Sequence, residues 1–201
     1  MIRRHSLVWL SEAPDGPETA AAWQEAGNPF IVCRTRPEET LSLGFCLPSA
    51  SGAPARVAAR SNLSHIVEAS RPPLLGEVAA KLSMPVPPAL LKPLEGATIR
   101  LIGSRMWEAI TGTRYTTGTS DLDLVVDLSA PGVADEVCSL LAHIDCPVRI
   151  DAELSFAGKG EVHWKEWGRD PLLVKSLHAV GVKPQSWIFE LEQSRSAPEG
   201  E

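Results

Sequence analysis

Long apolar runs are missing from this sequence of 201 residues. Its apolar stretches are short and interrupted by polar residues, which predicts that no transmembrane helix is present. The N-terminal segment MIRRHSLVWLSEAPDG holds an apolar run of only about five residues and no small-residue cleavage site, so we expect no signal peptide. From these absences the sequence predicts a cytoplasmic protein without a membrane partner.

Cysteine is also sparse, and the whole chain contains only Cys33, Cys46, Cys138 and Cys146. No two of them form a CxxC pair, and no histidine follows at the spacing of a zinc finger, which argues against a structural metal knuckle. Because we expect no secretory signal, four reduced thiols are the simplest interpretation.

Positive charge is deficient in the second half of the chain. Residues 101–201 carry 9 lysines and arginines against 16 aspartates and glutamates, whereas residues 1–100 carry 10 against 9. An acidic half does not suit a protein that wraps a nucleic acid polymer, so we expect no such partner. It suits a protein that holds divalent cations, although a solvated acidic surface is the commoner cause of such a bias.

The residues that are present predict an α/β protein with two modules, residues 1–90 and 97–201. In the first module the apolar spacing predicts three strands and three helical stretches: strands over 5–10, 29–34 and 42–48, helices over 17–27 and 75–82, and a helical stretch within 51–69. The proline-rich segment MPVPPALLKP, residues 84–93, predicts a boundary, because proline fixes φ and extends the residue before it.

The second module alternates between strand and helix patterns. The expected elements are strands over 97–103, 120–128 and 146–156, helices over 104–112 and 130–145, a hairpin partner over 161–167, and a helix or strand over 170–182.

Two carboxylates lie in a segment that otherwise has the pattern of a buried strand. Asp121 and Asp123 occur in SDLDLVVDL, and residues two apart in a strand point to the same face. Two like charges this close are unfavourable unless a cation bridges them, and Mg²⁺ prefers hard oxygen ligands. A DxD pair also arises often by chance, so the spacing alone identifies no metal site.

Two further segments carry residues suited to the same chemistry. Gly103 and Ser104 end a strand and begin a helix, where N–H groups suit a phosphate, although a simple strand-to-helix turn has the same pattern. Asp151 and Glu153 share one face of a later strand, and one of them could complete a two-metal site or act as base for an incoming hydroxyl. We assign Asp151 to the metal and keep Glu153 as its neighbour.

The order of these features resembles a known superfamily. Gly-Ser, a helix, an aspartate pair in a strand and a later strand carboxylate resemble the nucleotidyltransferases related to DNA polymerase β. The segments RHSLVWL, GSRMWEAITGTRYTTGTSDLDLVV, RIDAELSFAGKGEVHWKEW and LLVKSL are similar, in order, to the malonate decarboxylase holo-acyl-carrier-protein synthase family, the phosphoribosyl-dephospho-CoA transferases. The resemblance implies a nucleotidyltransferase-type mixed sheet with flanking helices, preceded by a small N-terminal α/β module.

The resemblance also implies a reaction. The enzyme would attach phosphoribosyl-dephospho-CoA from triphosphoribosyl-dephospho-CoA to a serine of the apo acyl carrier protein subunit of malonate decarboxylase, and release pyrophosphate. Asp121 and Asp123 would bind Mg²⁺, Asp151 would help to deprotonate the serine, and Gly103 and Ser104 would hold the leaving phosphates. The rival interpretations are a transferase of AMP from ATP on the same scaffold and a non-catalytic nucleotide-binding module.

Several cations are weaker candidates. Lys165, Lys175 and Arg105 could contact the triphosphate, and the alternative for each is a side chain that reaches solvent. We interpret His163 as structural or exposed rather than catalytic. The segment TGTRYTTGT, residues 111–119, must form an ordered excursion between the two halves of the site.

The first module contains arginines that predict either a docking face for an acidic carrier protein or a solvated surface. They are Arg34, Arg36, Arg56, Arg60 and Arg71.

Overall fold

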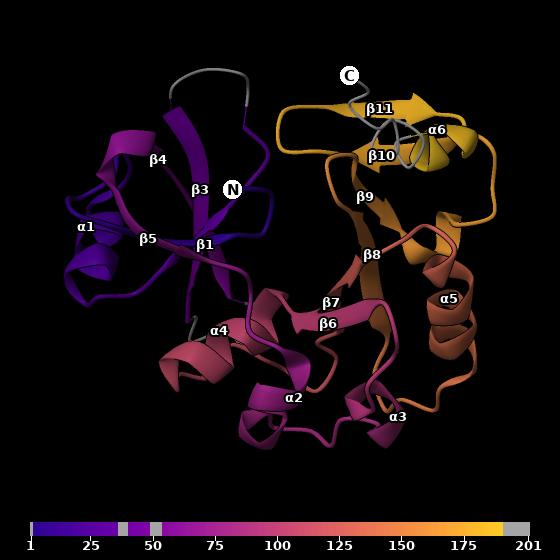
Figure 1. Cartoon of the computed structure of the whole chain (residues 1–201). Helices are drawn as coiled ribbons and strands as arrows, with labels where there is room; N and C mark the ends of the chain where they lie inside the picture. Colours follow the sequence, from indigo (N-terminus) through magenta and orange to yellow (C-terminus); the bar gives the residue numbers. More distant parts are fainter. Residues whose placement is uncertain (1, 36–39, 49–53, 191–201) are drawn as a thin grey trace, which may run out of the picture.

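Two β-sheets, one from each half of the chain, organise the protein (Figure 1). The computed structural model describes residues 2–35, 40–48 and 54–190. Figure 1 shows the first sheet in indigo and purple beside the second sheet, which runs from magenta to yellow. The α/β class expected from the sequence is confirmed. In the described ranges no helix is long and apolar enough to cross a membrane.

The first sheet is antiparallel throughout and has five strands in the order β4-β3-β2-β1-β5. The strands are β1 (Leu7–Leu10), β2 (Phe30–Val32), β3 (Thr40–Leu47), β4 (Ala55–Asn62) and β5 (Ile66–Ser70). Helix α1 (Glu18–Glu25) covers the sheet through Trp23, whose ring lies 5.0 Å from that of Phe45. The indole N–H of Trp23 donates to the Pro29 carbonyl oxygen at 2.8 Å, so this buried side chain keeps its polar atom paired.

The helical stretch expected within residues 51–69 is wrong for the described part of that segment, and residues 51–53 lie outside it. Residues 55–70 form β4 and β5, joined by the 3-10 turn η1 (Leu63–His65). The alanines and arginines of β4 favour a helix locally, but β4 pairs with β3 over eight residues, from Thr40↔Asn62 to Leu47↔Ala55. Pairing with a distant strand therefore overrides the local preference.

A short helical segment connects the sheets. Helix α2 (Leu75–Val78) continues as the 3-10 helix η2 (Ala79–Lys81), close to the helix expected over 75–82, and α3 (Pro88–Leu91) lies within the proline-rich segment. The backbone N–H of Leu101 donates to the Pro73 carbonyl oxygen at 3.0 Å. The segment just before α2, which the sequence assigned to the first module, thus bonds to the second sheet.

The second sheet is mixed, as expected, and its strand order is β11-β10-β9-β8-β7-β6. Its strands are β6 (Ala97–Leu101), β7 (Leu122–Leu128), β8 (Ile150–Phe156), β9 (Gly160–His163), β10 (Leu172–Lys175) and β11 (Val180–Lys183), with helices α4 (Gly103–Thr111), α5 (Val133–His143), η3 (Trp164–Glu166) and α6 (Ser186–Phe189). Segment 170–182, left open between helix and strand, contributes to the hairpin β10–β11.

One parallel strand pair determines where the carboxylates lie. Helix α5 connects β7 to β8, and these two strands pair in parallel with Asp123 opposite Asp151. The neighbours Leu122, Leu124 and Ala152 are fully buried. Alternation along both strands therefore places the apolar residues in the core and the two carboxylates on the opposite face.

The two modules share a continuous core. Trp107 of α4 meets Trp23 of α1 edge to face, with ring centroids 5.5 Å apart. Trp107 is 2% exposed, so it acts in packing. The face of the first sheet is thereby fixed against the start of α4.

Candidate active site

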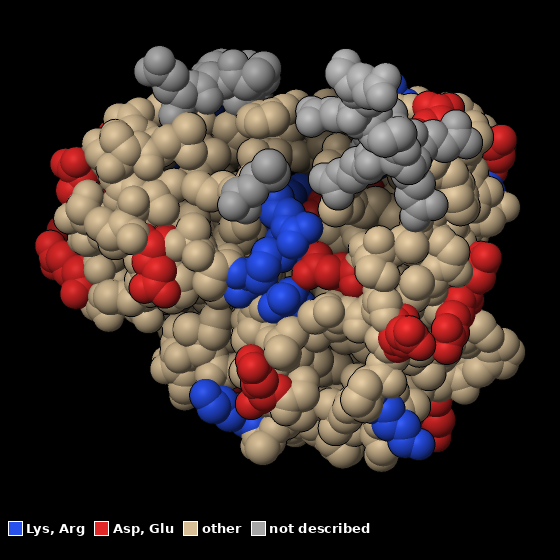
Figure 2. All heavy atoms as spheres, viewed as in Figure 1, with Lys and Arg blue, Asp and Glu red and all other residues tan. Residues whose placement is uncertain are grey.

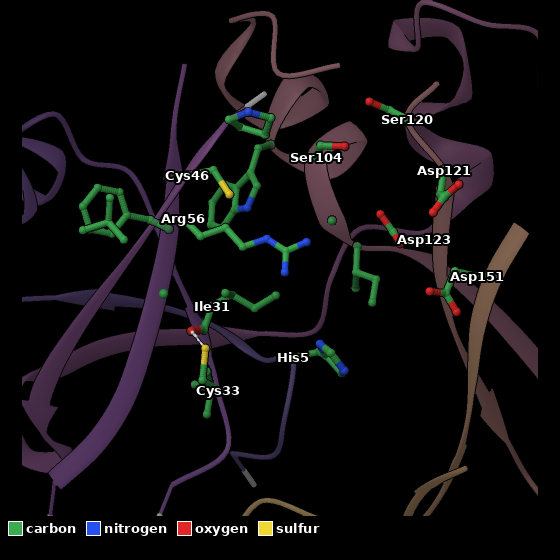
Figure 3. A pocket seen from close by; sticks show the side chains of 18 of the residues that line it. His5, Ile31, Cys33, Cys46, Arg56, Ser104, Ser120, Asp121, Asp123 and Asp151 are labelled. Carbon is green, nitrogen blue, oxygen red and sulfur yellow. Dashed lines mark hydrogen bonds between the residues drawn. The ribbon is translucent and has the colours of Figure 1, made fainter. Parts of the chain in front are cut away.

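A cavity of about 780 Å³ lies between the two sheets. One side is formed by residues of β2, β3 and β4, and the other by the starts of α4, β7 and β8. Figure 2 shows basic and acidic side chains meeting in the hollow between the two halves of the molecule. Figure 3 shows the residues that line the cavity, with the aspartates on one side and Arg56 on the other.

The structure brings the three predicted aspartates together. Asp121 precedes β7, Asp123 lies within it and Asp151 lies on β8. One carboxylate oxygen of each is within 4.8 Å of those of the other two. All three are partly buried and line the cavity. Asp151, rather than Glu153, is therefore the third carboxylate of this group.

The cluster carries an excess of negative charge. Burial and the neighbouring carboxylates of Asp151 and Asp121 raise the pKa of Asp123 from its usual 3.8 to about 6. Arg149 forms an ion pair with Asp121, and its side chain is 65% exposed. Three hard oxygen donors from adjoining strands, with repulsion between them and an open side, fit a Mg²⁺ ion.

Gly103 is the residue that permits this arrangement next to a helix. Its φ is +70°, and a Cβ atom built on it would lie 2.7 Å from Cγ of Asp123 and closer still to Oδ2. Helix α4 begins here, and both Gly103 and Ser104 line the cavity. The first N–H groups of a helix have no partner within the helix, which suits an anion beside the carboxylates.

Arg105 has a different place from the phosphate contact considered for it. Arg105 is 3% exposed and is absent from the cavity lining. Its Nε and Nη2 donate to the backbone carbonyl oxygens of Asp121 and Ser120 at 2.9 and 2.6 Å. Arg105 thus holds the end of the excursion that delivers Asp121 to the cluster.

The excursion itself is ordered, as expected. Thr116 Oγ1 donates to Glu108 of α4 at 2.6 Å, and the Thr117 N–H donates to Ser120 Oγ at 2.9 Å. These bonds anchor the segment to α4 and to the start of β7.

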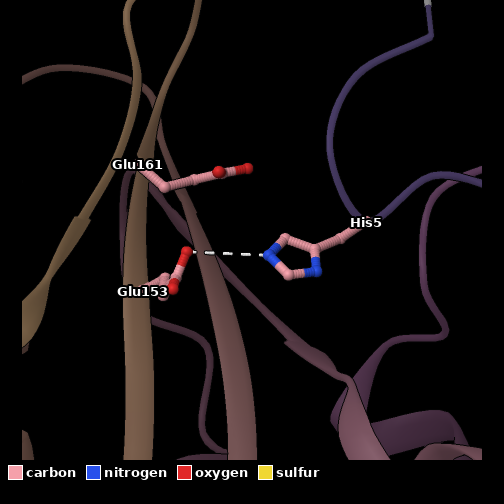
Figure 4. A group of neighbouring side chains, drawn as sticks. All are labelled: His5, Glu153 and Glu161. Carbon is pink, nitrogen blue, oxygen red and sulfur yellow. Dashed lines mark ion pairs between the residues drawn. The ribbon is translucent and has the colours of Figure 1, made fainter. Parts of the chain in front are cut away.

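Glu153 lines the cavity but is committed to ion pairs. Its carboxylate forms ion pairs with Arg4 at 2.6 Å and with Lys175 at 3.0 Å. His5 Nε2 lies 3.6 Å from the same carboxylate (Figure 4). Burial alone would raise the pKa of Glu153, but His5, Arg4 and Lys175 hold it below its ordinary range. Arg4 also reaches Glu161 at 3.2 Å. His5, Glu153 and Glu161 lie close enough to share an ion, but Arg4 already pairs with both carboxylates and Lys175 with Glu153.

Lys165 and Lys175, the two lysines expected to contact the triphosphate, do not line the cavity. Lys175 is the ion-pair partner of Glu153, and Lys165 on η3 lies with Nζ 5.3 Å from the ring centroid of Trp164. The structure thus gives both lysines contacts other than the expected triphosphate.

His163 contacts the cluster, which the sequence interpretation missed. Its Nδ1 accepts the backbone N–H of Lys165 at 3.2 Å, so Nε2 carries the hydrogen and donates to Oδ1 of Asp151 at 2.9 Å. The register of the β8–β9 hairpin, with Glu153 opposite His163, brings this side chain to Asp151. The sequence predicted a hairpin over these segments, so its register was the signal that could have placed His163 near Asp151.

The arginines of the first module have different surroundings. Arg34 and Arg56 line the cavity, whereas Arg71 pairs with Asp127 of β7 at 2.7 Å. Arg60 forms a backbone bridge with Asp15, and Arg36 lies outside the described residues.

Comparison with known proteins identifies a family that the chain resembles over most of its length. The family model described as phosphoribosyl-dephospho-CoA transferase MdcG C-terminal domain matches residues 74–185, and its N-terminal counterpart matches residues 3–72. A phosphoribosyl-dephospho-CoA transferase of Bradyrhizobium diazoefficiens is 32% identical over 200 residues, covering 88% of each chain. One of Xanthomonas euvesicatoria pv. vesicatoria is 29% identical and covers 96% of this chain and 100% of its own. No solved structure matches the chain significantly.

Proposed function

The chain belongs to the phosphoribosyl-dephospho-CoA transferase family, and from this premise we propose that it loads an acyl carrier protein with that group. Family membership makes it a transferase enzyme. The proposed donor is triphosphoribosyl-dephospho-CoA, and the proposed acceptor is a serine of the apo acyl carrier protein subunit of malonate decarboxylase.

The transfer is a displacement at phosphorus. The serine oxygen forms a bond to the phosphorus nearest the ribose, and the bond from that phosphorus to the next bridging oxygen breaks. Pyrophosphate leaves with the bonding electrons, and the hydroxyl proton passes to a base. The product is a phosphodiester between the serine and phosphoribosyl-dephospho-CoA.

The site supplies a residue for each requirement. Asp121, Asp123 and Asp151 are the proposed ligands of Mg²⁺, which when bound would neutralise charge on the phosphate oxygens. The start of α4 at Gly103 and Ser104 is the proposed cradle of the leaving phosphates. Asp151 is the proposed base: His163 donates to its Oδ1, and Oδ2 would accept the proton of the serine hydroxyl.

One observation carries the proposal. The strand pairing puts Asp123 beside Asp151, and Gly103 lets the start of α4 approach Asp123 at the same cavity wall. A set of carboxylates beside a helix N-terminus suits a cation and a polyphosphate together.

Intact-mass spectrometry of the acceptor tests the proposal. The protein is incubated with Mg²⁺, apo acyl carrier protein and either triphosphoribosyl-dephospho-CoA or ATP. We expect the acceptor to gain the mass of phosphoribosyl-dephospho-CoA with the first donor and no mass with ATP. An acceptor whose serine is changed to alanine, and the variant Asp123→Asn, should both give no adduct.

The same experiment separates the rivals. An acceptor that gains AMP from ATP identifies a nucleotidyltransferase of the other kind. No adduct with either donor, in a protein that remains folded, supports a binding module and contradicts the proposal.

A further inference from the structure

The two walls of the cavity carry opposite charge. The aspartate cluster lies on the second sheet, and Arg56 extends from β4 of the first sheet toward it (Figure 3). Its positive charge is close enough to lower the pKa of Asp123, against the larger effect of burial. Arg34, which follows β2, lines the same side.

These two arginines differ from the other cations around the cavity. Arg4 is paired with Glu153 and Glu161, and Arg149 with Asp121. Within residues 2–35, 40–48 and 54–190, no carboxylate pairs with Arg56 or Arg34, and both side chains are exposed to the cavity. They therefore present guanidinium groups to whatever lies between the walls.

Space for a ligand exists in front of Arg56. On β3, the strand beside it, Gly44 and Cys46 line the cavity, with Cys46 directly opposite Arg56 in the register. Both residues have small side chains, and the cavity that they line has a volume of about 780 Å³.

A polyphosphate needs donors on more than one side. A cation held by the aspartates can neutralise only the phosphate oxygens that face the second sheet. Oxygens that face the other way require a different partner, and the planar guanidinium suits them because it donates two parallel hydrogen bonds.

We propose that Arg56, assisted by Arg34, binds the polyphosphate chain of the donor from the wall opposite the aspartate cluster. The first module then supplies half of the donor site, and a cation and two guanidinium groups hold the chain between them. The identity of the donor as triphosphoribosyl-dephospho-CoA rests on the proposed function, whereas the binding of a polyphosphate by Arg56 and Arg34 does not.

Isothermal titration with inorganic tripolyphosphate in the presence of Mg²⁺ tests the assignment without carrier protein or donor. We compare the full chain with Arg56→Gln, Arg56→Lys and Arg60→Gln. Arg60 is a matched control, because it lies on the same strand and does not line the cavity. We expect Arg56→Gln to weaken binding roughly tenfold or more, as for loss of a charge-assisted hydrogen bond. Arg56→Lys should recover part of that loss, and Arg60→Gln should bind as the unchanged chain does.

Mn²⁺ binding in the absence of tripolyphosphate provides the second readout. Arg56→Gln should retain it, since the arginine contacts the anion and not the cation, and this retention also shows that the variant is folded. Equal tripolyphosphate affinity in Arg56→Gln and the unchanged chain overturns the assignment, as does an absence of binding in both. If Arg56 proves necessary for tripolyphosphate binding but no carrier adduct forms, the proposed function is wrong while the assignment of Arg56 to polyphosphate binding is supported.

Discussion

Gly103 and Asp123 fit together only because residue 103 has no side chain. A Cβ atom there would lie 2.7 Å from Cγ of Asp123, and the φ of +70° is one that other residues rarely adopt. The same glycine begins α4. One residue thus fixes the distance between the helix N-terminus and the carboxylate cluster.

Substitution of Gly103 by alanine should therefore damage both stability and transfer. Gly112 provides a matched control, because its φ is also +70° and nothing lies within 4 Å of a Cβ built there. We expect Gly112→Ala to cost about 1 kcal/mol in backbone strain, and Gly103→Ala to cost a further 1–3 kcal/mol, roughly, from overpacking. Urea unfolding measures the loss of stability in each of the two variants. Equal losses in the two variants would show that the contact with Asp123 is unimportant.

The raised pKa of Asp123 predicts how stability changes with pH in metal-free buffer. The folded protein holds this proton up to about pH 6, whereas the unfolded chain releases it near 3.8. Between those values the folded state binds more protons, so its stability falls as pH rises. Residue 123 stays neutral in Asp123→Asn, so the free energy of unfolding of this variant relative to that of the unchanged chain should increase from pH 4 to pH 7.

The exposed Asp145 outside the cavity provides the control variant, Asp145→Asn. A difference between Asp123→Asn and the unchanged chain that is constant across the pH range would contradict the electrostatic account of the cluster.

Glu153 should matter for stability more than for donor binding, because its carboxylate joins Arg4 of the first module to Lys175 of the second sheet. Glu153→Gln leaves the partly buried Lys175 without a charged partner and Arg4 with Glu161 alone, and we expect a loss of about 2 kcal/mol at neutral pH. Since the pKa of Glu153 is held below its ordinary 4.5, this contribution is present above pH 4.5 and disappears as the pH falls further.

Denaturant unfolding at neutral and acidic pH measures the effect of Glu153. Glu12→Gln is the comparison, because Glu12 is 62% exposed in its pair with His65 and should contribute less than about 0.5 kcal/mol. If Glu153→Gln loses no more stability than Glu12→Gln, the ion pairs of Glu153 do not stabilise the contact between the first module and the second sheet.

His163 donates to Oδ1 of Asp151, and we expect it to affect transfer through that carboxylate. His163→Ala removes the donor and should lower kcat roughly tenfold with little change in KM for the donor substrate. His163→Gln places an amide N–H near the position of Nε2 and should restore much of the rate. Steady-state kinetics decide the matter: a rise in KM at constant kcat would point to substrate binding instead.

The carboxylate strands were predictable because their signals are local. Alternation in SDLDLVVDL and RIDAELSF showed which residues face away from the core, and the structure confirms this at Asp123 and Asp151. Their contact across the sheet depends on the parallel pairing of β7 with β8, which the helix between them made accessible to sequence reasoning.

The remaining features depend on contacts between residues far apart in the sequence. Arg56 lies on β4, a segment with helical local preference, and its place opposite Asp123 follows from how the two sheets pack. Arg105 has the sequence position of a phosphate ligand, yet its side chain bonds to backbone carbonyls of the excursion that folds over it. Neither placement leaves a pattern in the sequence nearby.

Direct titration of a divalent cation tests the central claim, that Asp121, Asp123 and Asp151 together form a metal site. Mn²⁺ binding is followed by electron paramagnetic resonance in the unchanged chain, in Asp123→Asn, in Asp151→Asn and in the control Asp145→Asn. We predict that the unchanged chain and the control bind Mn²⁺ alike, and that Mg²⁺ competes, whereas each cluster variant loses at least roughly tenfold in affinity. Binding that is equally strong in Asp123→Asn and Asp151→Asn, or absent from the unchanged chain, would contradict the account.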